Sequence, residues 1–237
     1  MRDQIFKEKI DISEFTFDQK VVDVFDDMVI RSVPGYRQMI ELIGLLARIY
    51  PKCDSNIYDL GCSTGASTSA VINNLNFKRI KVYAIDNSVE MINQAKENLK
   101  DISENIIFEI ANIEDSNIEN ASLIILNLTL QFIPLKSRYK FLEKIFDSLI
   151  PDGVLFLSEK IHFKDNIKQN LAEKLHIKFK EENGYSQTEI YNKRKALEKV
   201  LATETTEKHI SRLKKIGFKK VSIVSQCLNF VSFIAHK

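Results

Sequence analysis

Short, strongly apolar runs alternate with amphipathic helical stretches through the middle of this 237-residue chain, and this alternation limits the possible folds more than any other feature. The runs are NIYDLG from residue 56, IKVYAID from residue 80, NIIFEIA from residue 105, ASLIILNLTL from residue 121 and VLFLSEK from residue 154. Strands that are apolar on both faces are typical of parallel sheets, because the connecting helices cover both faces. The sequence therefore predicts an α/β fold on a mostly parallel sheet.

The end of the chain follows a different pattern. Two further apolar runs, KKVSIVSQ from residue 219 and LNFVSFIAHK from residue 228, are separated only by Cys227. So short a connection joins antiparallel strands, since parallel strands need a longer crossover. With the five earlier runs, this predicts a seven-stranded sheet that closes with an antiparallel C-terminal hairpin.

We expect a single domain with helical additions. Apolar residues at helical spacing before Pro34-Gly35 and again before Pro51 predict an N-terminal helical cap. The mostly polar stretch before the last two strands predicts a helical insertion that closes the site and forms a dimer. The expected parts are the cap (1–50), the nucleotide-binding core (51–160), the insertion (161–217) and the C-terminal hairpin (218–237).

Composition narrows the class of protein. The 34 basic residues barely exceed the 32 acidic ones, whereas nucleic-acid-binding domains usually concentrate positive charge, so we expect no direct nucleic-acid binding. The cysteines at 53, 62 and 227 lack metal-ligand spacing and are odd in number, so we expect no metal and a reducing compartment. No run approaches the roughly 20 apolar residues of a membrane span, and MRDQIFKEKI lacks an apolar leader. We expect a cytoplasmic protein without membrane attachment.

The loop GCSTG, residues 61–65, joins the first predicted strand to a helix and is a candidate nucleotide cradle. Glycines let backbone approach a ligand closely at a helix N-terminus. A Walker A loop is excluded because no lysine follows Gly65, and a dinucleotide fingerprint is weak because Ser63 replaces the second glycine. S-adenosylmethionine, which has no phosphate, fits the loop better. A tight turn without a ligand remains the alternative.

Asp86 ends the second predicted strand, 25 residues after Gly61. A carboxylate at this position can accept hydrogen bonds from both hydroxyl groups of a ribose. Because ligands of such folds bind beyond the carboxyl ends of the strands, we expect Asn112 and Asn127 at the same edge. The alternative for Asp86 is a favourable charge at the N-terminus of the next helix.

Together, the loop, Asp86 and the closing hairpin resemble the class I S-adenosylmethionine-dependent methyltransferases, a Rossmann-like fold. Longer blocks are similar to the carboxy-S-adenosylmethionine synthase family: DDMVIRSVPGYRQMI, SNIYDLGCSTGAST, NASLIILNLTLQFIP, FKEENGYSQTEIYNKRKALEKVL and QCLNFVSFIAHK. This resemblance implies a homodimeric transferase that converts S-adenosylmethionine and prephenate to carboxy-S-adenosylmethionine and phenylpyruvate. Another enzyme then uses the product to build 5-oxyacetic acid on wobble uridine in tRNA.

The resemblance also implies the site residues. The cofactor contacts are expected at Tyr36, Gly61, Cys62, Ser63, Asp86, Asn87, Asn112, Ile113, Asn127 and Arg194. Asn112 departs from the family, in which aspartate is usual, although an amide oxygen can still accept from an adenine amino group. Arg194 is the expected catalytic residue, because a guanidinium holds a carboxylate with two parallel hydrogen bonds. Without the resemblance, Arg194 reads as one solvated charge in a basic helix.

The implied chemistry needs a sulfonium ylide, with prephenate supplying both carbon dioxide and the base. The protein then needs a closed, dry site and cations for carboxylates, with Arg31 and Arg37 as further candidates. Two other functions remain open. A conventional methyltransferase of a small molecule or tRNA would form S-adenosylhomocysteine, and a non-catalytic scaffold would bind the cofactor without turnover.

Overall fold

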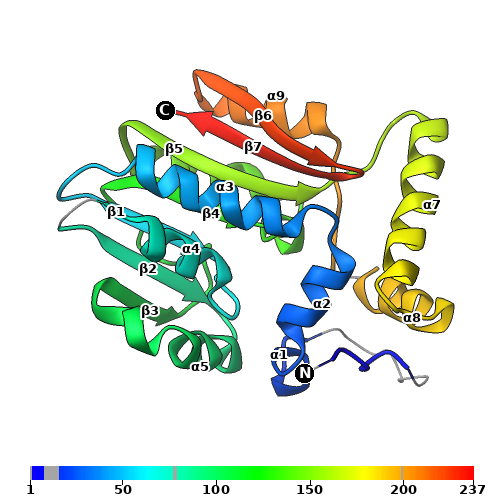
Figure 1. Ribbon diagram of the computed structural model, residues 1–237. Coiled ribbons are helices and arrows are strands. Elements are labelled where there is room, and N and C mark those ends of the chain that lie inside the picture. The colour runs from blue at the N-terminus through cyan, green and yellow to red at the C-terminus, as the bar shows by residue number, and fades with distance from the viewer. Residues whose placement is uncertain (1, 8–15, 77–78, 199) are drawn as a thin grey trace.

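The computed structural model describes residues 2–7, 16–76, 79–198 and 200–237. Within these residues, seven strands form one sheet in the order β3-β2-β1-β4-β5-β7-β6 (Figure 1). The strands are β1 (Asn56–Leu60), β2 (Lys81–Asp86), β3 (Ile106–Ile110), β4 (Ala121–Asn127), β5 (Leu149–Lys160), β6 (Lys220–Cys227) and β7 (Phe230–His236). The first five are parallel, and β7 runs antiparallel to both β5 and β6. The predicted seven-stranded sheet with its closing hairpin is confirmed.

The hairpin differs from the prediction in its turn. Cys227 is the last residue of β6, and the connection consists of Leu228 and Asn229. Leu228 has a φ of 52°, in the left-handed region that tight hairpin turns require. Because a leucine takes this conformation, no glycine marks the turn in the sequence.

Helices cover both faces of the sheet. The helices α3 (Tyr36–Ile49) and α4 (Ala66–Asn74) pack on one face, and α6 (Arg138–Ser148) and α9 (Thr206–Ile216) pack on the other. The neighbours Ile124 and Ile125 of β4 enter opposite cores, because successive side chains of a strand point to opposite faces. This two-sided burial explains why the strands read as continuous apolar runs. The helix α5 (Val89–Asn98) packs beside β2 and β3.

The remaining helices gather beyond the carboxyl ends of β1, β4 and β5 (Figure 1). They are α1 (Gln19–Val22), α2 (Phe25–Ser32), α7 (Asn166–Glu182) and α8 (Gln187–Leu197). Short 3₁₀ helices lie elsewhere in the chain: η1 (Lys100–Asn105) precedes β3, and η2 (Leu130–Phe132) follows β4. The first part of the predicted cap and part of the predicted insertion thus meet at one edge of the sheet, whereas α3, which was also predicted in the cap, and α9 pack on the sheet itself. Of the helices in the described part of the chain, none is both long and apolar enough to cross a membrane.

Candidate functional site

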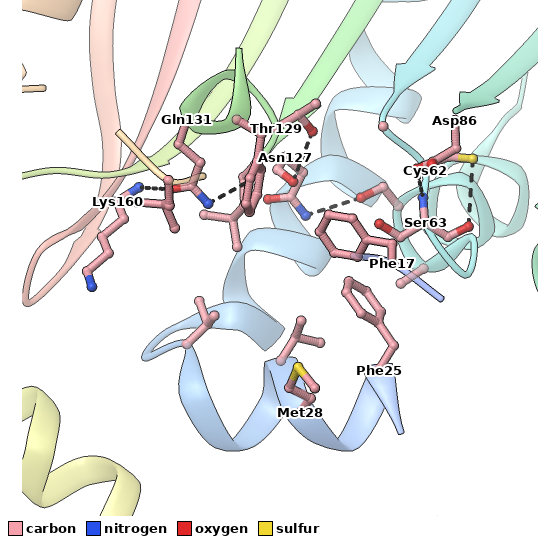
Figure 2. Close-up of a pocket in the computed structure, with 18 of the residues that line it drawn as sticks. Phe17, Phe25, Met28, Cys62, Ser63, Asp86, Asn127, Thr129, Gln131 and Lys160 are labelled. Atoms are coloured by element: carbon pink, nitrogen blue, oxygen red, sulfur yellow. Dashed lines mark hydrogen bonds between the residues drawn. The ribbon is translucent and has the colours of Figure 1, made fainter. Parts of the chain in front are cut away.

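A cavity of about 520 Å³ is lined by residues of α2, α7 and α8 and by residues at the carboxyl ends of the strands. Figure 2 shows its aromatic and sulfur-bearing side chains, Phe17, Phe25 and Met28, facing the glycine loop and the strand ends. The expected cofactor contacts that line it are Tyr36, Gly61, Cys62, Ser63, Asp86, Asn87, Asn112, Ile113 and Asn127. Arg194 is the one expected contact that does not line this cavity.

The loop after β1 is held tightly against β2. The backbone N–H groups of Gly61 and Cys62 both donate to the carbonyl of Ile85, at 2.8 and 3.0 Å. Gly61 has a φ of 80°, and a Cβ there would lie 2.5 Å from Cγ2 of Thr129. Both its conformation and the close approach of Thr129 therefore require glycine. Burial, together with Asp59 and Asp86, raises the pKa of the Cys62 thiol, so this side chain remains uncharged.

Ser63 adopts a glycine-like conformation although it replaces the usual glycine. Its φ is 48°, and its backbone N–H donates to Oδ2 of Asp86 at 3.0 Å (Figure 2). Oδ1 of Asp86 accepts from the N–H of Ser88 at 3.0 Å. Burial raises the pKa of Asp86, and these backbone hydrogen bonds oppose that effect. Ser88, rather than Asp86, caps α5, accepting from the N–H of Met91 through its hydroxyl group.

Asn127, the last residue of β4, has half of its amide unpaired. Its Nδ2 donates to the hydroxyl of Ser67 at 3.2 Å, but its Oδ1 is buried and has no hydrogen-bond partner among the described residues. An unpaired buried carbonyl oxygen costs about 1–3 kcal/mol. The ammonium group of S-adenosylmethionine is a donor that would satisfy this atom. The cavity therefore fits that nucleotide at an atom that the protein leaves open.

Asn112 shapes the turn after β3. Its Nδ2 donates to Asp115 at 3.1 Å, and its Oδ1 accepts from the N–H of Glu114 at 3.2 Å. Its backbone carbonyl accepts from the N–H groups of Asp115 and Ser116. These bonds hold the turn in which Ile113 faces the cavity. The contact between Asn112 and adenine stays a prediction.

Acidic groups surround the glycine loop. Asp26 accepts from the hydroxyl of Thr64 at 2.6 Å, which joins α2 to the loop. Asp59 accepts from Thr68 at 2.6 Å, and burial raises the pKa of Asp59 to about 7. Burial, together with Asp26 and Asp59, raises the pKa of the Tyr36 phenol, so it remains a hydrogen-bond donor. This negative surrounding suits a sulfonium cation.

The cations of the cavity are not the arginines expected from the sequence. Lysines at 160, 180 and 193 line it. Arg31 is buried and structural: its Nε donates to the carbonyl of Asn183 at 2.6 Å, and its guanidinium lies 4.0 Å above the ring of Tyr185. Arg37 is exposed and outside the lining. The side chain of Arg194 is 66% exposed, and its guanidinium lies 3.5 Å from the carboxylate of Glu173.

One of the three lysines was visible in the sequence. Lys160 is the last residue of the run VLFLSEK, so the carboxyl-edge argument that selected Asp86 and Asn127 also applies to it. Lys180 and Lys193 belong to polar helices rich in lysine, where no local signal separates them from solvated charges.

Comparisons with known proteins agree with this geometry. Residues 51–217 match a sequence family described as a methyltransferase domain. Human N-acetylserotonin methyltransferase in complex with SAM has a similar structure, with a TM-score of 0.63, 18% identity, and coverage of 92% of this chain and 55% of that chain. A putative S-adenosyl-L-methionine-dependent methyltransferase from Methanococcus maripaludis is also similar in structure, with a TM-score of 0.62 and 17% sequence identity over 95% of each chain. The fold is that of the class I S-adenosylmethionine-dependent methyltransferases.

The sequence relatives narrow the assignment. A carboxy-S-adenosyl-L-methionine synthase of Ruthia magnifica subsp. Calyptogena magnifica is 46% identical over 100% of both chains. Another, from Shewanella sediminis (strain HAW-EB3), is 47% identical over 95% of this chain and 94% of its own. The chain therefore belongs to the carboxy-S-adenosyl-L-methionine synthase family.

Proposed function

We propose that this enzyme converts S-adenosylmethionine and prephenate to carboxy-S-adenosylmethionine, phenylpyruvate and water. The observation that supports this most is the 46% identity to a named synthase over the whole of both chains. A cavity with a nucleotide end and a cationic end agrees with it, since one substrate is a sulfonium nucleotide and the other a dicarboxylate.

The proposed reaction balances without a catalytic base from the protein. The ring carboxylate of prephenate leaves as carbon dioxide, and the electrons of the broken C–C bond aromatise the ring and expel its hydroxyl group as hydroxide. Hydroxide takes a proton from the S-methyl group and becomes water. The resulting ylide carbon then bonds to carbon dioxide.

Among the described residues that line the cavity, the histidine supports this scheme. His176 is the one histidine among them, and burial, with Lys180 and Lys160 nearby, lowers its pKa to about 3. Its Nε2 lies 2.8 Å from the carbonyl of Ser32, which can only accept, so Nε2 carries the hydrogen. A histidine this acidic is a poor base.

The scheme also needs water to be excluded, since water would protonate the ylide. The ring of Phe17 packs edge-on against Phe25 and Phe132, with centroids 6.3 and 5.6 Å apart. All three rings line the cavity. Their contacts connect the N-terminal segment, which carries Phe17, to the segment after β4, which carries Phe132. This apolar wall supports a closed reaction chamber.

We further propose that Arg194 binds the carboxylate of the product. Because its guanidinium pairs with Glu173 outside the cavity, this role requires either a turn of its side chain or entry into the site of a second protomer. A homodimer is supported by exposed apolar side chains near it: Ile167, Leu171 and Leu175 of α7 and Tyr191 of α8. We also place the enzyme in the cytoplasm, supplying the cofactor for wobble-uridine modification in tRNA without itself binding nucleic acid.

The test is mass spectrometry of a reaction with S-adenosylmethionine and prephenate. The expected products are a nucleotide heavier than S-adenosylmethionine by one carbon dioxide, and phenylpyruvate in equal amount. Omission of prephenate should abolish both. Formation of S-adenosylhomocysteine instead would identify a conventional methyltransferase.

A further inference from the structure

The end of the cavity opposite the glycine loop is lined by lysines from three elements. Lys160 ends β5, Lys180 is in the last turn of α7 and Lys193 is in α8. Figure 2 shows Lys160 on the other side of the cavity from Asp86, with Asn127 between them. A ligand that fills the cavity from the nucleotide end therefore leaves this lysine cluster to a second molecule.

The three lysines are not equally satisfied. Nζ of Lys193 donates to the hydroxyl of Ser32 at 2.8 Å and lies 3.8 Å from the carboxylate of Asp3. For the ammonium groups of Lys160 and Lys180, the described residues provide neither a hydrogen bond nor an ion pair. Lys193 is thus part of the scaffold, whereas the other two are available to a ligand.

The charges around Lys180 are mostly positive. Burial lowers the pKa of Lys180 to about 7, together with the positive charges of Lys160 from β5 and of Lys193 and Arg194 from α8. On its own helix His176 is neutral, and Glu173 is already paired with Arg194.

From α2, Arg31 carries its own counter-charge, Asp27, at 3.0 Å. Asp3, from the N-terminal segment, forms an ion pair with Lys193. The lysines therefore repel one another in a partly enclosed space, and an anion bound there would relieve this repulsion and favour the charged form of Lys180.

We propose that Lys160 and Lys180 form the subsite for the two carboxylates of the carboxyl-donating substrate, an inference that rests on the function proposed above. Two lysines without a partner match a dianion, whose charge would hold both side chains in the ammonium form, and Phe230, Leu197 and Leu201 of the same cavity offer apolar walls to its ring. A donor bound there lies between the lysines and the sulfonium group. Attraction from both sides then holds it beside the methyl group that becomes carboxylated.

The test replaces Lys160 and Lys180 by methionine, singly and together, which removes the charge and keeps an apolar stem. Each single variant should raise the KM for prephenate about tenfold to hundredfold, as expected for a lost charge-assisted hydrogen bond. The dissociation constant for S-adenosylmethionine, measured by calorimetry, should change less than about twofold. Melting temperatures should not fall, because the substitution removes charges that repel each other.

Lys178→Met is the matched control. This lysine is on the same helix, its side chain is 64% exposed, and it pairs with Glu181 and Glu182. Its replacement should leave both constants unchanged. A folded Lys160→Met/Lys180→Met double variant with the wild-type KM for prephenate would overturn the subsite.

Failure of the proposed function would be seen separately, as wild-type protein that forms no carboxylated nucleotide. Calorimetric titration of prephenate into wild-type protein with bound S-adenosylmethionine then decides the subsite alone. Binding that disappears in the double variant supports it. No binding to the wild-type protein overturns it.

Discussion

Lys193 and Arg194 are neighbours in α8, yet their side chains have opposite surroundings. Lys193 is 6% exposed and lines the cavity, whereas the side chain of Arg194 is 66% exposed. Successive residues of a helix point about 100° apart, so the docking of α8 decides which one faces inward. At the nucleotide end of the cavity, single residues again determine the shape and polarity of the site: the backbone of Gly61 and the unpaired Oδ1 of Asn127.

Asn127→Ala should separate binding from stability. The variant removes an oxygen that has no partner within the described protein and one hydrogen bond, from Nδ2 to Ser67, so folding should lose only about 1 kcal/mol. S-adenosylmethionine should bind at least about tenfold more weakly, because a hydrogen bond to a charged donor is lost. Calorimetry and thermal unfolding measure the two quantities. Unchanged affinity would show that the nucleotide does not use this atom, and Asn73→Ala, on the exposed surface of α4, is the control.

At the scale of elements, the site depends on how α7 and α8 dock against α2. Arg31 of α2 is the main connection: it bonds the carbonyl of Asn183 between α7 and α8, pairs with Asp27, and stacks on Tyr185. Nζ of Lys193 reaches back to Ser32 at the end of α2. The cationic end of the cavity therefore exists only while these helices stay docked.

Arg31→Ala should loosen this docking. Removing a buried, paired guanidinium should cost about 3 kcal/mol, because Asp27 and the carbonyl of Asn183 lose their partner. Hydrogen exchange should accelerate around residues 183–190 more than in the strands. Arg37→Ala, at an exposed position of α3, should change neither exchange nor melting temperature. Equal behaviour of the two variants would contradict the structural role of Arg31.

The exposed stripe on α7 leads to a prediction about assembly. Ile167, Leu171 and Leu175 are 80%, 57% and 46% exposed and repeat every four residues, so they share one helix face. If this face is the dimer contact, Leu171→Asp should convert a dimer to a monomer in light scattering. Val89→Asp, an exposed apolar position on α5, should remain dimeric. A dimeric Leu171→Asp protein would move the contact elsewhere.

At the scale of the whole molecule, a buried ionic network joins distant segments. Arg138 is fully buried and donates to the carbonyls of Gln131, Ile133 and Ala202, and it pairs with Glu204. This arginine ties the loop after β4 to the segment that leads into α9. The wall of the cavity beyond β4 is thereby part of the core rather than a free loop.

His209 of α9 makes the stability of this core depend on pH. Burial, with Arg212, Arg138 and His162 nearby and Glu204 opposing, lowers the pKa of His209 to about 4. The unfolded chain, with an ordinary pKa near 6.5, binds the proton first as the pH falls, so stability is lost between about 6.5 and 4. The loss is up to about 3 kcal/mol. His209→Leu should lose less stability than wild type over this range in urea unfolding, and parallel curves would refute the assignment.

The strands of the sheet and the residues at their carboxyl ends could be predicted from the sequence, because they depend on short stretches of chain. Each strand is apolar on both faces, and polar or glycine residues at the strand ends identified Gly61, Asp86 and Asn127 as neighbours. Strand ends are less predictable: the apolar run from residue 121 extends to Leu130, but the strand stops at Asn127, because Leu128 turns with a φ of 62°. No sequence pattern indicates that a leucine will adopt a left-handed backbone conformation.

The sheet, its closing hairpin and the nucleotide end of the site thus follow from local pattern, since hydrophobic period and strand-end chemistry are properties of a few consecutive residues. The cationic end does not. Lys180 and Lys193 face the cavity because α7 and α8 dock on α2 and on the N-terminal segment, where the hydroxyl of Tyr185 donates to Asp3, 182 residues earlier. Only contacts between such distant residues decide which charges of a polar helix are buried and which remain in water.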